Sequence, residues 1–358
     1  MNRVVSLYSG AGGLDLGFKR EEFSIIWAND FDQDACKTYE LNIGNHIKHG
    51  DIHSYIPEIQ KIRQKVDVLI GGPPCQGFSV AGKMDPQDER SKNVWTFTKI
   101  LDILKPKAFL MENVKALGSL HKWSPLRDAL LQKMRNSGYS VNYIILNAAD
   151  FSVPQARERV FFIGFKANPF IVPNLQEMLL PYRKEARTVR ETLSILDRVG
   201  TGNNTSVCNA KITIAPKPVL RKSPFAGMLF NGLGRPIRLD GYSATLPASM
   251  GGNKTPIIDN DELYLGKKGW VETYHKKLRD GKVTPHEVKI PTRLRRLTLE
   301  EAALLQTFPL DYSFYGSQSS KFKQIGNAVP CGLARQLALL FKDYLATTNI
   351  EKKIIPLN

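Results

Sequence analysis

The sequence predicts an α/β fold with a largely parallel sheet, together with a second, smaller and loop-rich domain. Over residues 1–165, short apolar runs alternate with helix-like segments, which is the pattern of repeated strand–helix–strand units. From about residue 167 the chain becomes rich in Pro, Gly, Asn and Lys, with irregular runs such as TGNNTSVCN. This change in texture separates the two predicted domains.

The apolar runs of the first part give the expected strands. They cover residues 4–8, 24–28, 66–70, 108–111, 140–146 and 160–165. Helices are expected between them, for example over residues 33–41 and 95–104. Ligands of such sheets bind at the carboxyl ends of the strands. The residues that follow each strand are therefore the first candidates for function.

Two further helices are predicted near the C-terminus. Residues 298–306 read TLEEAALLQ, with Thr298 as the expected N-cap and Glu301 at the capping-box position. The last helix is expected over residues 330–345, after the segment QIGNAVP.

The composition favours a soluble, intracellular protein. A hydrophobic fraction of 42% over 358 residues is enough for a full core. No apolar run approaches the ~18 residues that span a membrane, and the N-terminus has no secretory h-region. The cysteines form no CxxC pair, which argues against a disulfide framework or a metal site. We expect free thiols, most of them small buried hydrophobes, at Cys36, Cys75, Cys208 and Cys331.

The positive charge is concentrated in one part of the chain. The net charge is +16, and residues 166–296 hold 23 Lys and Arg against 11 Asp and Glu, a surplus of 12. Such a local block suggests a polyanion partner, with nucleic acid first. The alternative is a generally basic, soluble surface. A membrane surface is disfavoured, because the charges do not fall on one amphipathic helix.

A glycine-rich turn, SGAGGLDLGF, follows the first strand. Gly10, Gly12 and Gly13 allow close backbone approach, and the N-terminus of the next helix favours an anion. The dinucleotide fingerprint G-x-G-x-x-G would need a glycine at position 15, where Asp15 stands.

Acidic and aromatic residues follow the second strand and recur in the third element of the chain. In WANDFD, Asp30 is well placed to bind ribose hydroxyls and Phe31 to stack on an adenine ring. The alternative for Asp30 is a helix N-cap. In HGDIH, Asp51 could accept a hydrogen bond from an adenine amino group. Together with the glycine turn, these residues describe a nucleoside pocket.

The fourth strand ends in GGPPCQGFS, where two prolines fix the backbone before Cys75. This thiol is either a packed side chain or a nucleophile held on a rigid corner. After the fifth strand, Glu112 has apolar neighbours, so we expect desolvation to raise its pKa and allow proton donation near neutral pH. Its alternative role is a buried partner of a Lys or Arg. In VPQARERVFFIGF, Arg157 and Arg159 alternate on an extended segment and are expected on one face, where they suit phosphate or carbonyl recognition.

These blocks resemble those of the DNA (cytosine-5) methyltransferases. In order, the family's blocks appear as SGAGGLDLGF, Asp30-Phe31, GGPPCQGFSVAG, MENV, VPQARERVFFIGF, RRLTLEEAALLQTFP and QIGNAVP. The complete set in this order is highly specific. The resemblance implies an S-adenosylmethionine-dependent methyltransferase (Rossmann-like) sheet over residues 1–167 plus 297–358. It implies a target-recognition domain over residues 168–296, where the surplus charge lies.

The resemblance implies S-adenosylmethionine as the cofactor. The methionine end would be lined by Tyr8, Gly10 and Gly13. The remaining cofactor contacts would come from Asp30, Phe31, Asp51, Ile52, Pro73 and Asn327.

The resemblance also implies the catalytic chemistry. Cys75 would add to C6 of a flipped-out cytosine, since a thiolate there makes C5 nucleophilic. Glu112 would hydrogen-bond or protonate N3, and Arg159 would hold O2, with Arg157 supporting the site. No metal is implied. Segment 76–93 would close over DNA, and the expected DNA contacts are Gln76, Ser79 and Thr245.

Several alternatives remain beside this reading. The tripeptide Gln76-Gly77-Phe78 fits the DNA enzymes better than the tRNA cytosine methyltransferases of the same fold. Intact catalytic residues disfavour a dead DNA-binding protein, and the glycine spacing disfavours a nucleotide-dependent oxidoreductase. We expect a compact prokaryotic or phage enzyme, a cytoplasmic monomer associated with the nucleoid through double-stranded DNA. It would protect DNA from a cognate restriction endonuclease or act as an orphan regulatory methyltransferase.

Overall fold

A computed structural model describes residues 1–74 and 92–354, which form two compact units. Unit 1 comprises Met1–Ser152, Glu158–Glu185 and Val329–Asn358, so the C-terminal segment belongs with the N-terminal half of the chain. Unit 2 comprises Val153–Arg157 and Ala186–Ala328. The division predicted from sequence, 1–167 plus 297–358 against 168–296, concerns which residues perform which function and stays a prediction.

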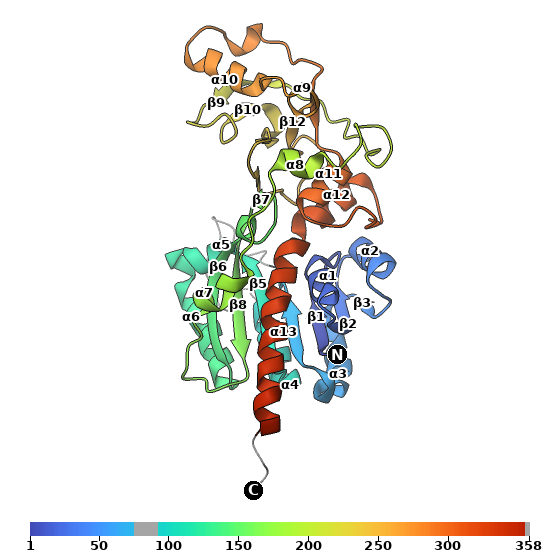
Figure 1. The fold of residues 1–358 in the computed structure, drawn as a ribbon, viewed down its shortest axis with the longest axis vertical. Coiled ribbons are helices and arrows are strands. Elements are labelled where there is room, and N and C mark those ends of the chain that lie inside the picture. Colours follow the sequence, from blue (N-terminus) through green and yellow to red (C-terminus); the bar gives the residue numbers. More distant parts are fainter. Residues whose placement is uncertain (75–91, 355–358) are drawn as a thin grey trace. The chain divides into compact units, whose positions relative to one another are not determined.

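Unit 1 is built on a seven-stranded sheet with the strand order β3-β2-β1-β4-β5-β8-β6 (Figure 1). All neighbouring strands from β3 to β5 pair in parallel, whereas β8 is antiparallel to both β5 and β6. The reversal follows from chain length: ten residues separate the end of β6 at Asn147 from the start of β8 at Glu158. This connection is shorter than the dozen or more residues that a parallel crossover usually needs.

The strands and helices of unit 1 alternate along most of its length. Its strands are β1 (Arg3–Leu7), β2 (Ser24–Asp30), β3 (Ile47–His49), β4 (Val68–Gly71), β5 (Ala108–Val114), β6 (Ser140–Asn147) and β8 (Glu158–Phe165). Its helices are α1 (Gly13–Arg20), α2 (Gln33–Asn42), α3 (Ile56–Lys61), α4 (Lys92–Leu104), α5 (Lys115–Ser119), α6 (Ser124–Asn136), α7 (Leu175–Leu179) and α13 (Cys331–Ile354).

Helices cover both faces of this sheet. Apolar residues of α4 and α6, such as Phe97 and Leu130, form one core cluster with strand residues such as Phe109. On the other face, the ring of Phe341 in α13 contacts Phe18 of α1 and Phe165 of β8, with centroid distances of 5.6 and 5.8 Å. A side chain at Gly17 would lie 2.4 Å from the Ala334 Cβ, so α1 and α13 can pack this closely only because residue 17 is glycine.

Unit 2 consists of short elements joined by loops. Its apolar cluster lies between β10, β12, β13 and α10, and Trp270 stacks on Tyr274 at 4.9 Å. The strands are β7 (Gln155–Ala156), β9 (Ile214–Val219), β10 (Met228–Phe230), β11 (Ser243–Ala244), β12 (Ile257–Asp259) and β13 (Leu294–Arg296). The helices are α8 (Val189–Leu193), α9 (Asn260–Leu265), α10 (Trp270–Arg279), α11 (Leu299–Leu305) and α12 (Gln318–Asn327).

The structure confirms the α/β class, and all six predicted strands of the first part are present. The capping box at the start of α11 is also confirmed, with Thr298 Oγ1 accepting from the Glu301 amide at 3.1 Å. Within the described residues, none of the helices combines the length and apolar character needed to cross a membrane. The three described thiols are free and buried, as predicted for Cys36, Cys208 and Cys331.

Candidate functional site

The glycine-rich turn connects β1 to α1 in a conformation that glycine favours. Gly10 and Gly12 have φ angles of +55° and +82°, in the left-handed region. Gly12 is the N-cap of α1, where its amide donates to the Ser9 carbonyl at 3.0 Å. A Cβ built at Gly10 meets no described heavy atom within 4 Å, so there is room beside the turn for a ligand.

Asp30, the last residue of β2, binds this turn directly. Its Oδ2 accepts from the Gly10 amide at 2.7 Å, and its Oδ1 accepts from the Asp32 amide at 2.8 Å. Burial raises the pKa of the Asp30 carboxyl. Asp32, rather than Asp30, is the N-cap of α2, so the alternative role considered for Asp30 is wrong.

Aromatic and acidic groups surround the same end of the sheet. The ring of Phe31 is 76% exposed, which is unusual for phenylalanine and leaves its face available for stacking. Asp51 is exposed and accepts from the His53 amide at 2.9 Å, while Ile52 beside it is buried. The Tyr8 hydroxyl donates to Asn93 Oδ1 at 3.2 Å, and burial raises the pKa of Tyr8.

These features fit the ribose, adenine and methionine parts of S-adenosylmethionine. An open glycine turn suits a main chain that approaches a ligand closely. A carboxylate at the end of the second strand suits ribose hydroxyls. An exposed aromatic ring beside it suits a purine face. The residues predicted for the cofactor in unit 1 therefore collect at the carboxyl ends of neighbouring strands.

Glu112 and Arg159, predicted separately as catalytic residues, form an ion pair. Arg159 Nε lies 3.1 Å from Glu112 Oε1, and the two side chains are 18% and 13% exposed. The pair joins β5 to β8, where Val114 is the register partner of Arg159. The alternative considered for Glu112, a partly buried partner of an arginine, is thus also present, and the two roles are compatible.

The segment that leads to Cys75 packs against the end of β5. Asn113 Nδ2 donates to the Pro73 carbonyl at 3.1 Å, and a Cβ built at Gly72 would lie 3.1 Å from Glu112 Oε2. This brings the GGPP part of GGPPCQGFS beside Glu112. The predicted residues Cys75, Gln76 and Ser79 lie outside the described residues.

Arg157 belongs to unit 2 and is buried among main-chain acceptors. Its guanidinium donates to the carbonyls of Leu246 at 3.3 Å and Gly326 at 3.0 Å. The residue lies between β7 and β8, not within one continuous strand. The expected placement of Arg157 and Arg159 on one face of an extended segment stays a prediction; the structure gives the two side chains different partners, main-chain carbonyls for Arg157 and Glu112 for Arg159.

The other predicted residues of unit 2 are exposed. Thr245 follows β11 and donates from Oγ1 to the Ala156 carbonyl at 3.1 Å. Asn327 is the last residue of α12, next to Gly326, whose carbonyl binds Arg157. The Arg157 guanidinium thus links the segments that carry Thr245 and Asn327.

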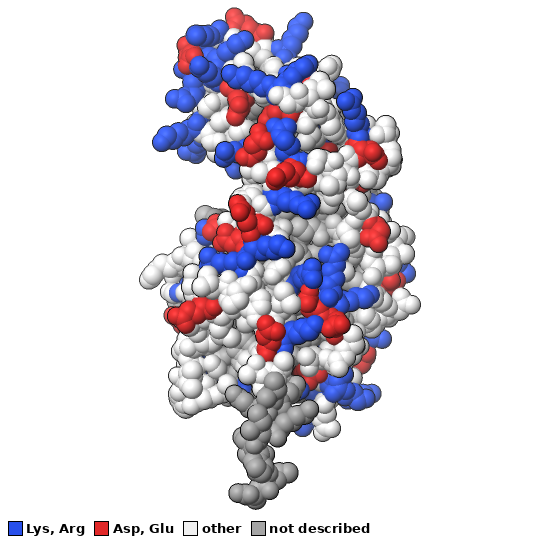
Figure 2. All heavy atoms as spheres, in the orientation of Figure 1, with Lys and Arg blue, Asp and Glu red and all other residues white. Residues whose placement is uncertain are grey.

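Unit 2 also presents a basic surface. On the face shown in Figure 2, Lys and Arg side chains are dense over the end that carries β9, β10 and α10. A shallow pocket of about 600 Å³ lies there, where the imidazole of His275 in α10 donates from Nε2 to the Arg221 carbonyl at 2.9 Å. Its lining residues are Leu220, Arg221, Lys222, Leu278 and Arg279.

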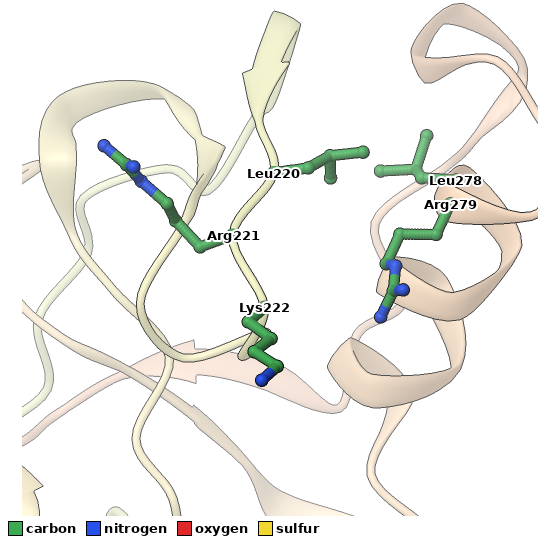
Figure 3. A pocket seen from close by; sticks show the side chains of 5 residues that line it. All are labelled: Leu220, Arg221, Lys222, Leu278 and Arg279. Carbon is green, nitrogen blue, oxygen red and sulfur yellow. The ribbon is translucent and has the colours of Figure 1, made fainter.

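The side chains of this pocket divide by character (Figure 3). Leu220 and Leu278 point toward one another, whereas Lys222 and Arg279 extend toward the same side and Arg221 points away. Both Lys222 and Arg279 are exposed. Two exposed cations that line the same open pocket suit a phosphate group.

The sequence reasoning missed two residues that shape the site. Asn113 holds the Pro73 carbonyl, and its only signal was its position directly after Glu112. Asp15, which the sequence analysis considered only as the residue in place of a fingerprint glycine, is fully buried in α1. The signal for Asp15 was the strongly apolar surroundings in LDLGF.

Comparison with known proteins gives a consistent result. The family model for C-5 cytosine-specific DNA methylases matches residues 2–342. The Type II methyltransferase M1.HphI of Haemophilus parahaemolyticus is 32% identical over 344 residues, covering 93% of this chain and 85% of that protein. The Type II methyltransferase M.FnuDI of Fusobacterium nucleatum is 32% identical over 359 residues, covering 99% and 98%.

Solved structures support the fold. A putative DNA modification methyltransferase encoded within a prophage of E. coli has a TM-score of 0.68 at 22% identity, covering 97% of this chain and 100% of that chain. The Dnmt2 methyltransferase of S. pombe has a TM-score of 0.65 at 18% identity, covering 96% and 99%.

Proposed function

Because this chain belongs to the C-5 cytosine-specific DNA methylase family and is a DNA (cytosine-5-)-methyltransferase, we propose that it methylates a flipped-out cytosine in a specific duplex sequence. The methyl donor is S-adenosylmethionine, and Cys75 is the nucleophile. The observation that carries this assignment is the Glu112–Arg159 pair, at 3.1 Å, beside the segment that leads to Cys75.

The chemistry requires a nucleophile because C5 of cytosine has little electron density. The Cys75 thiolate adds to C6, and the electron pair of the C5–C6 bond becomes available at C5. S-adenosylmethionine, when bound, supplies an electrophilic methyl group at that carbon. Loss of the C5 proton then restores the double bond and expels the thiolate. The target carbon is inside the duplex, so the base must leave the stack at a cost of a few kcal/mol.

Glu112 and Arg159 hold the opposite edge of the base in this proposal. The Glu112 carboxyl hydrogen-bonds or protonates N3 and offsets the charge that develops in the ring. The Arg159 guanidinium donates to O2 and orients the Glu112 carboxyl through their ion pair. Arg157 acts indirectly, because its guanidinium holds together the segments that carry Thr245 and Asn327.

The cofactor is held by the strand ends of unit 1. Tyr8, Gly10 and Gly13 line its methionine end, and Asp30 accepts from the ribose hydroxyls. The adenine face lies against Phe31, and its edge contacts Asp51 and Ile52. Pro73 also contacts the cofactor, and Asn327 of unit 2 is the further cofactor residue that the resemblance implies. Asp30 already accepts from the Gly10 amide, so the ribose and methionine sites are structurally coupled.

DNA is bound by residues of both units. Gln76, Ser79 and Thr245 contact the target region. We further propose that Lys222 and Arg279 bind a backbone phosphate, which positions the duplex without reading its sequence. These two cations lie on the most basic part of the chain, where residues 166–296 carry a surplus of 12 positive charges.

One experiment tests the reaction and the nucleophile together. Purified protein is incubated with methyl-labelled S-adenosylmethionine and duplex DNA of varied sequence, and a Cys75→Ala variant is run in parallel. We expect label in DNA with the wild type and none with the variant. Absence of label in DNA would show the proposed activity to be wrong. Label transferred by the alanine variant would exclude Cys75 as the nucleophile, and preferential labelling of RNA would favour the tRNA alternative.

The names of the relatives, which are Type II methyltransferases, support a proposal for the biological role. We propose that this enzyme protects DNA from a cognate restriction endonuclease and acts as a monomer in the cytoplasm. Bisulfite sequencing of DNA from expressing cells identifies the methylated sequence. Resistance of that DNA to an endonuclease that cuts the same sequence supports protection, and cleavage would contradict it.

A further inference from the structure

Asp15 is a buried carboxylate for which the proposed reaction has no direct use. It lies in the first turn of α1 and has 0% exposure. Its Oδ2 accepts from Ser6 Oγ of β1 at 2.9 Å, and its Oδ1 accepts from the Tyr39 hydroxyl of α2 at 2.9 Å. A single carboxyl group therefore ties β1, α1 and α2 together.

The same network reaches the glycine turn. Ser9 Oγ donates to Ser6 Oγ at 2.9 Å, so Ser6 connects Asp15 to the turn. The Ser9 amide donates to the Asn29 carbonyl at 2.9 Å, directly before Asp30, which accepts from Gly10. Ser9 is thus anchored both to β2 through its amide and to Asp15 through its hydroxyl.

Ionisation of Asp15 determines the direction of these hydrogen bonds. A carboxylate can only accept, so both Ser6 and Tyr39 must donate to it, and the Ser6 oxygen can then accept from Ser9. On the other side, the Tyr39 oxygen lies 3.1 Å from His46 Nε2 and can accept its proton. A protonated Asp15 would have to donate to the hydroxyl of Ser6 or of Tyr39, which would reverse the direction of that hydrogen bond.

Burial makes the ionised form of Asp15 unfavourable. Burial raises the pKa of Asp15 to about 6, and the neighbouring Asp30 carboxylate acts in the same direction. Among the described residues no Lys or Arg forms an ion pair with Asp15. An asparagine would fill the same space without a charge. Retention of a costly buried charge beside a ligand turn is typical of a functional constraint.

We propose that the Asp15 carboxylate is a positioning residue that holds the glycine turn, through Ser6 and Ser9, in the conformation that binds the methionine end of S-adenosylmethionine. This inference rests on the proposed function. Affinity for the cofactor should therefore fall when Asp15 becomes protonated. The other ionisable groups near this network are Tyr39, Asp30 and His46, with Lys19 beside His46 and Arg335 of α13 engaged by Glu21.

The test is calorimetric titration of the full chain with S-adenosylhomocysteine between pH 5 and pH 8. For the wild type we expect constant affinity above about pH 6.5 and an approximately tenfold loss for each unit below about pH 6. Asp15→Asn should bind about tenfold more weakly at pH 7.5 and lose most of this pH dependence. Tyr39→Phe removes a donor to the carboxylate, so the midpoint should move to higher pH. Asp30 shares no described hydrogen bond with Tyr39. A midpoint that came from Asp30 instead of Asp15 would therefore not move in Tyr39→Phe.

The melting temperature separates positioning from a structural role. Asp15→Asn should melt at or above the wild-type temperature at pH 7.5, because a buried charge is removed. The control is Asp128→Asn, the same change at a side chain that is 68% exposed on α6, which should leave binding unchanged. If Asp15→Asn does not fold, Ser9→Ala removes the link at the turn and should weaken binding in the same way.

Three results would overturn the inference. The first is an Asp15→Asn variant with wild-type affinity and an unchanged midpoint. The second is a Ser9→Ala variant with wild-type affinity. The third is a loss of affinity in Asp15→Asn in proportion to a lower melting temperature. A wild-type chain that binds no analogue at any pH would instead contradict the cofactor assignment, on which this inference depends.

Discussion

At the scale of single residues, the Glu112–Arg159 pair is a structural contact between the two side chains to which we assign the base-holding role. Both side chains are mostly buried, and each charge compensates the other, which offsets the cost of removing both from water. The same pairing fixes the direction of the Glu112 carboxyl without help from a ligand. A carboxyl group held in one orientation is suited to donate a proton or a hydrogen bond to one ring nitrogen.

Glu112→Gln is expected to lower kcat for methyl transfer by about 100-fold or more, because an amide cannot donate a proton as an acid does. Binding of S-adenosylhomocysteine should not change, and stability should fall by only about 1–2 kcal/mol, since glutamine still accepts from Arg159. Initial rates with labelled donor and urea unfolding check both expectations. Glu158→Gln is the matched control, because Glu158 forms an exposed ion pair with Lys115 at 2.7 Å. Equal loss of rate in both variants would refute the role of Glu112.

Asp15 should also leave a signature in stability. Its folded pKa of about 6 lies above the ordinary value of 3.8, so the folded state retains the proton longer than the unfolded state. The contribution of this group is therefore full below pH 3.8 and is lost as the pH rises through about 6. Relative to wild type, Asp15→Asn should gain up to about 3 kcal/mol in unfolding free energy between pH 4 and pH 7. Urea unfolding at both pH values measures this, and a constant difference would contradict it.

Residue types and their order could nominate candidate site residues, which stay predictions, but could not give their contacts. Asp30 and Glu112 were found because each follows a recognisable strand. The apolar neighbours in LDLGF hinted at the burial of Asp15, but its contact with Tyr39, 24 positions away, was not predictable. The partners of Arg157 were missed because the sequence reads as one extended segment, whereas the main-chain acceptors at Leu246 and Gly326 are distant in sequence.

At the scale of elements, the packing of α1 against α13 depends on Gly17. Gly17→Ala should destabilise unit 1 by about 1–3 kcal/mol, because the new methyl group would lie 2.4 Å from the Ala334 Cβ. This outcome opposes helix propensity, which favours alanine by about 1 kcal/mol. Thermal unfolding provides the measurement. Gly252→Ala is the control, since no described atom lies within 4 Å of a Cβ there. A stabilised Gly17→Ala variant would show that the two helices can separate freely.

The proposed phosphate contacts in the pocket between β9 and α10 predict how DNA affinity depends on salt concentration. If Lys222 and Arg279 bind phosphate, replacing both with glutamine should weaken DNA binding equally for all sequences. It should also reduce the slope of log Kd against log salt by about 1–2, since each phosphate contact contributes about 0.9. Fluorescence anisotropy from 50 to 200 mM salt measures both effects. Lys267→Gln is the control, because Lys267 is paired with Asp261 at 3.0 Å. An unchanged slope in the double variant would exclude this pocket from the DNA interface.

Elements were predictable where local pattern decides them. The six predicted strands and the capping box of α11 follow from apolar runs and cap residues, which act over a few positions. Strand β3 was not predicted, because its three residues, Ile47–His49, are too few to give a pattern. The antiparallel direction of β8 was also missed, although the short connection after β6 contains the information.

At the scale of the whole molecule, the chain divides into two compact units of different composition. Unit 1 includes the residues predicted for the cofactor apart from Asn327, together with Glu112 and Arg159, whereas unit 2 includes Arg157, Asn327 and the exposed cation pair. The sequence predicts a functional division near residue 167, where charge and texture change together, and this division stays a prediction. The sequence could not predict the bounds of the compact units, since Val153–Arg157 joins unit 2 through pairing with β11, a contact between distant segments.

The central claim is that this enzyme methylates C5 of cytosine in duplex DNA. The most direct measurement is to label DNA with methyl-labelled S-adenosylmethionine, digest it to nucleosides and separate these by chromatography. The account predicts that all label elutes with 5-methyldeoxycytidine and that none appears with Cys75→Ala. Label that elutes with N4-methyldeoxycytidine or N6-methyldeoxyadenosine would contradict it.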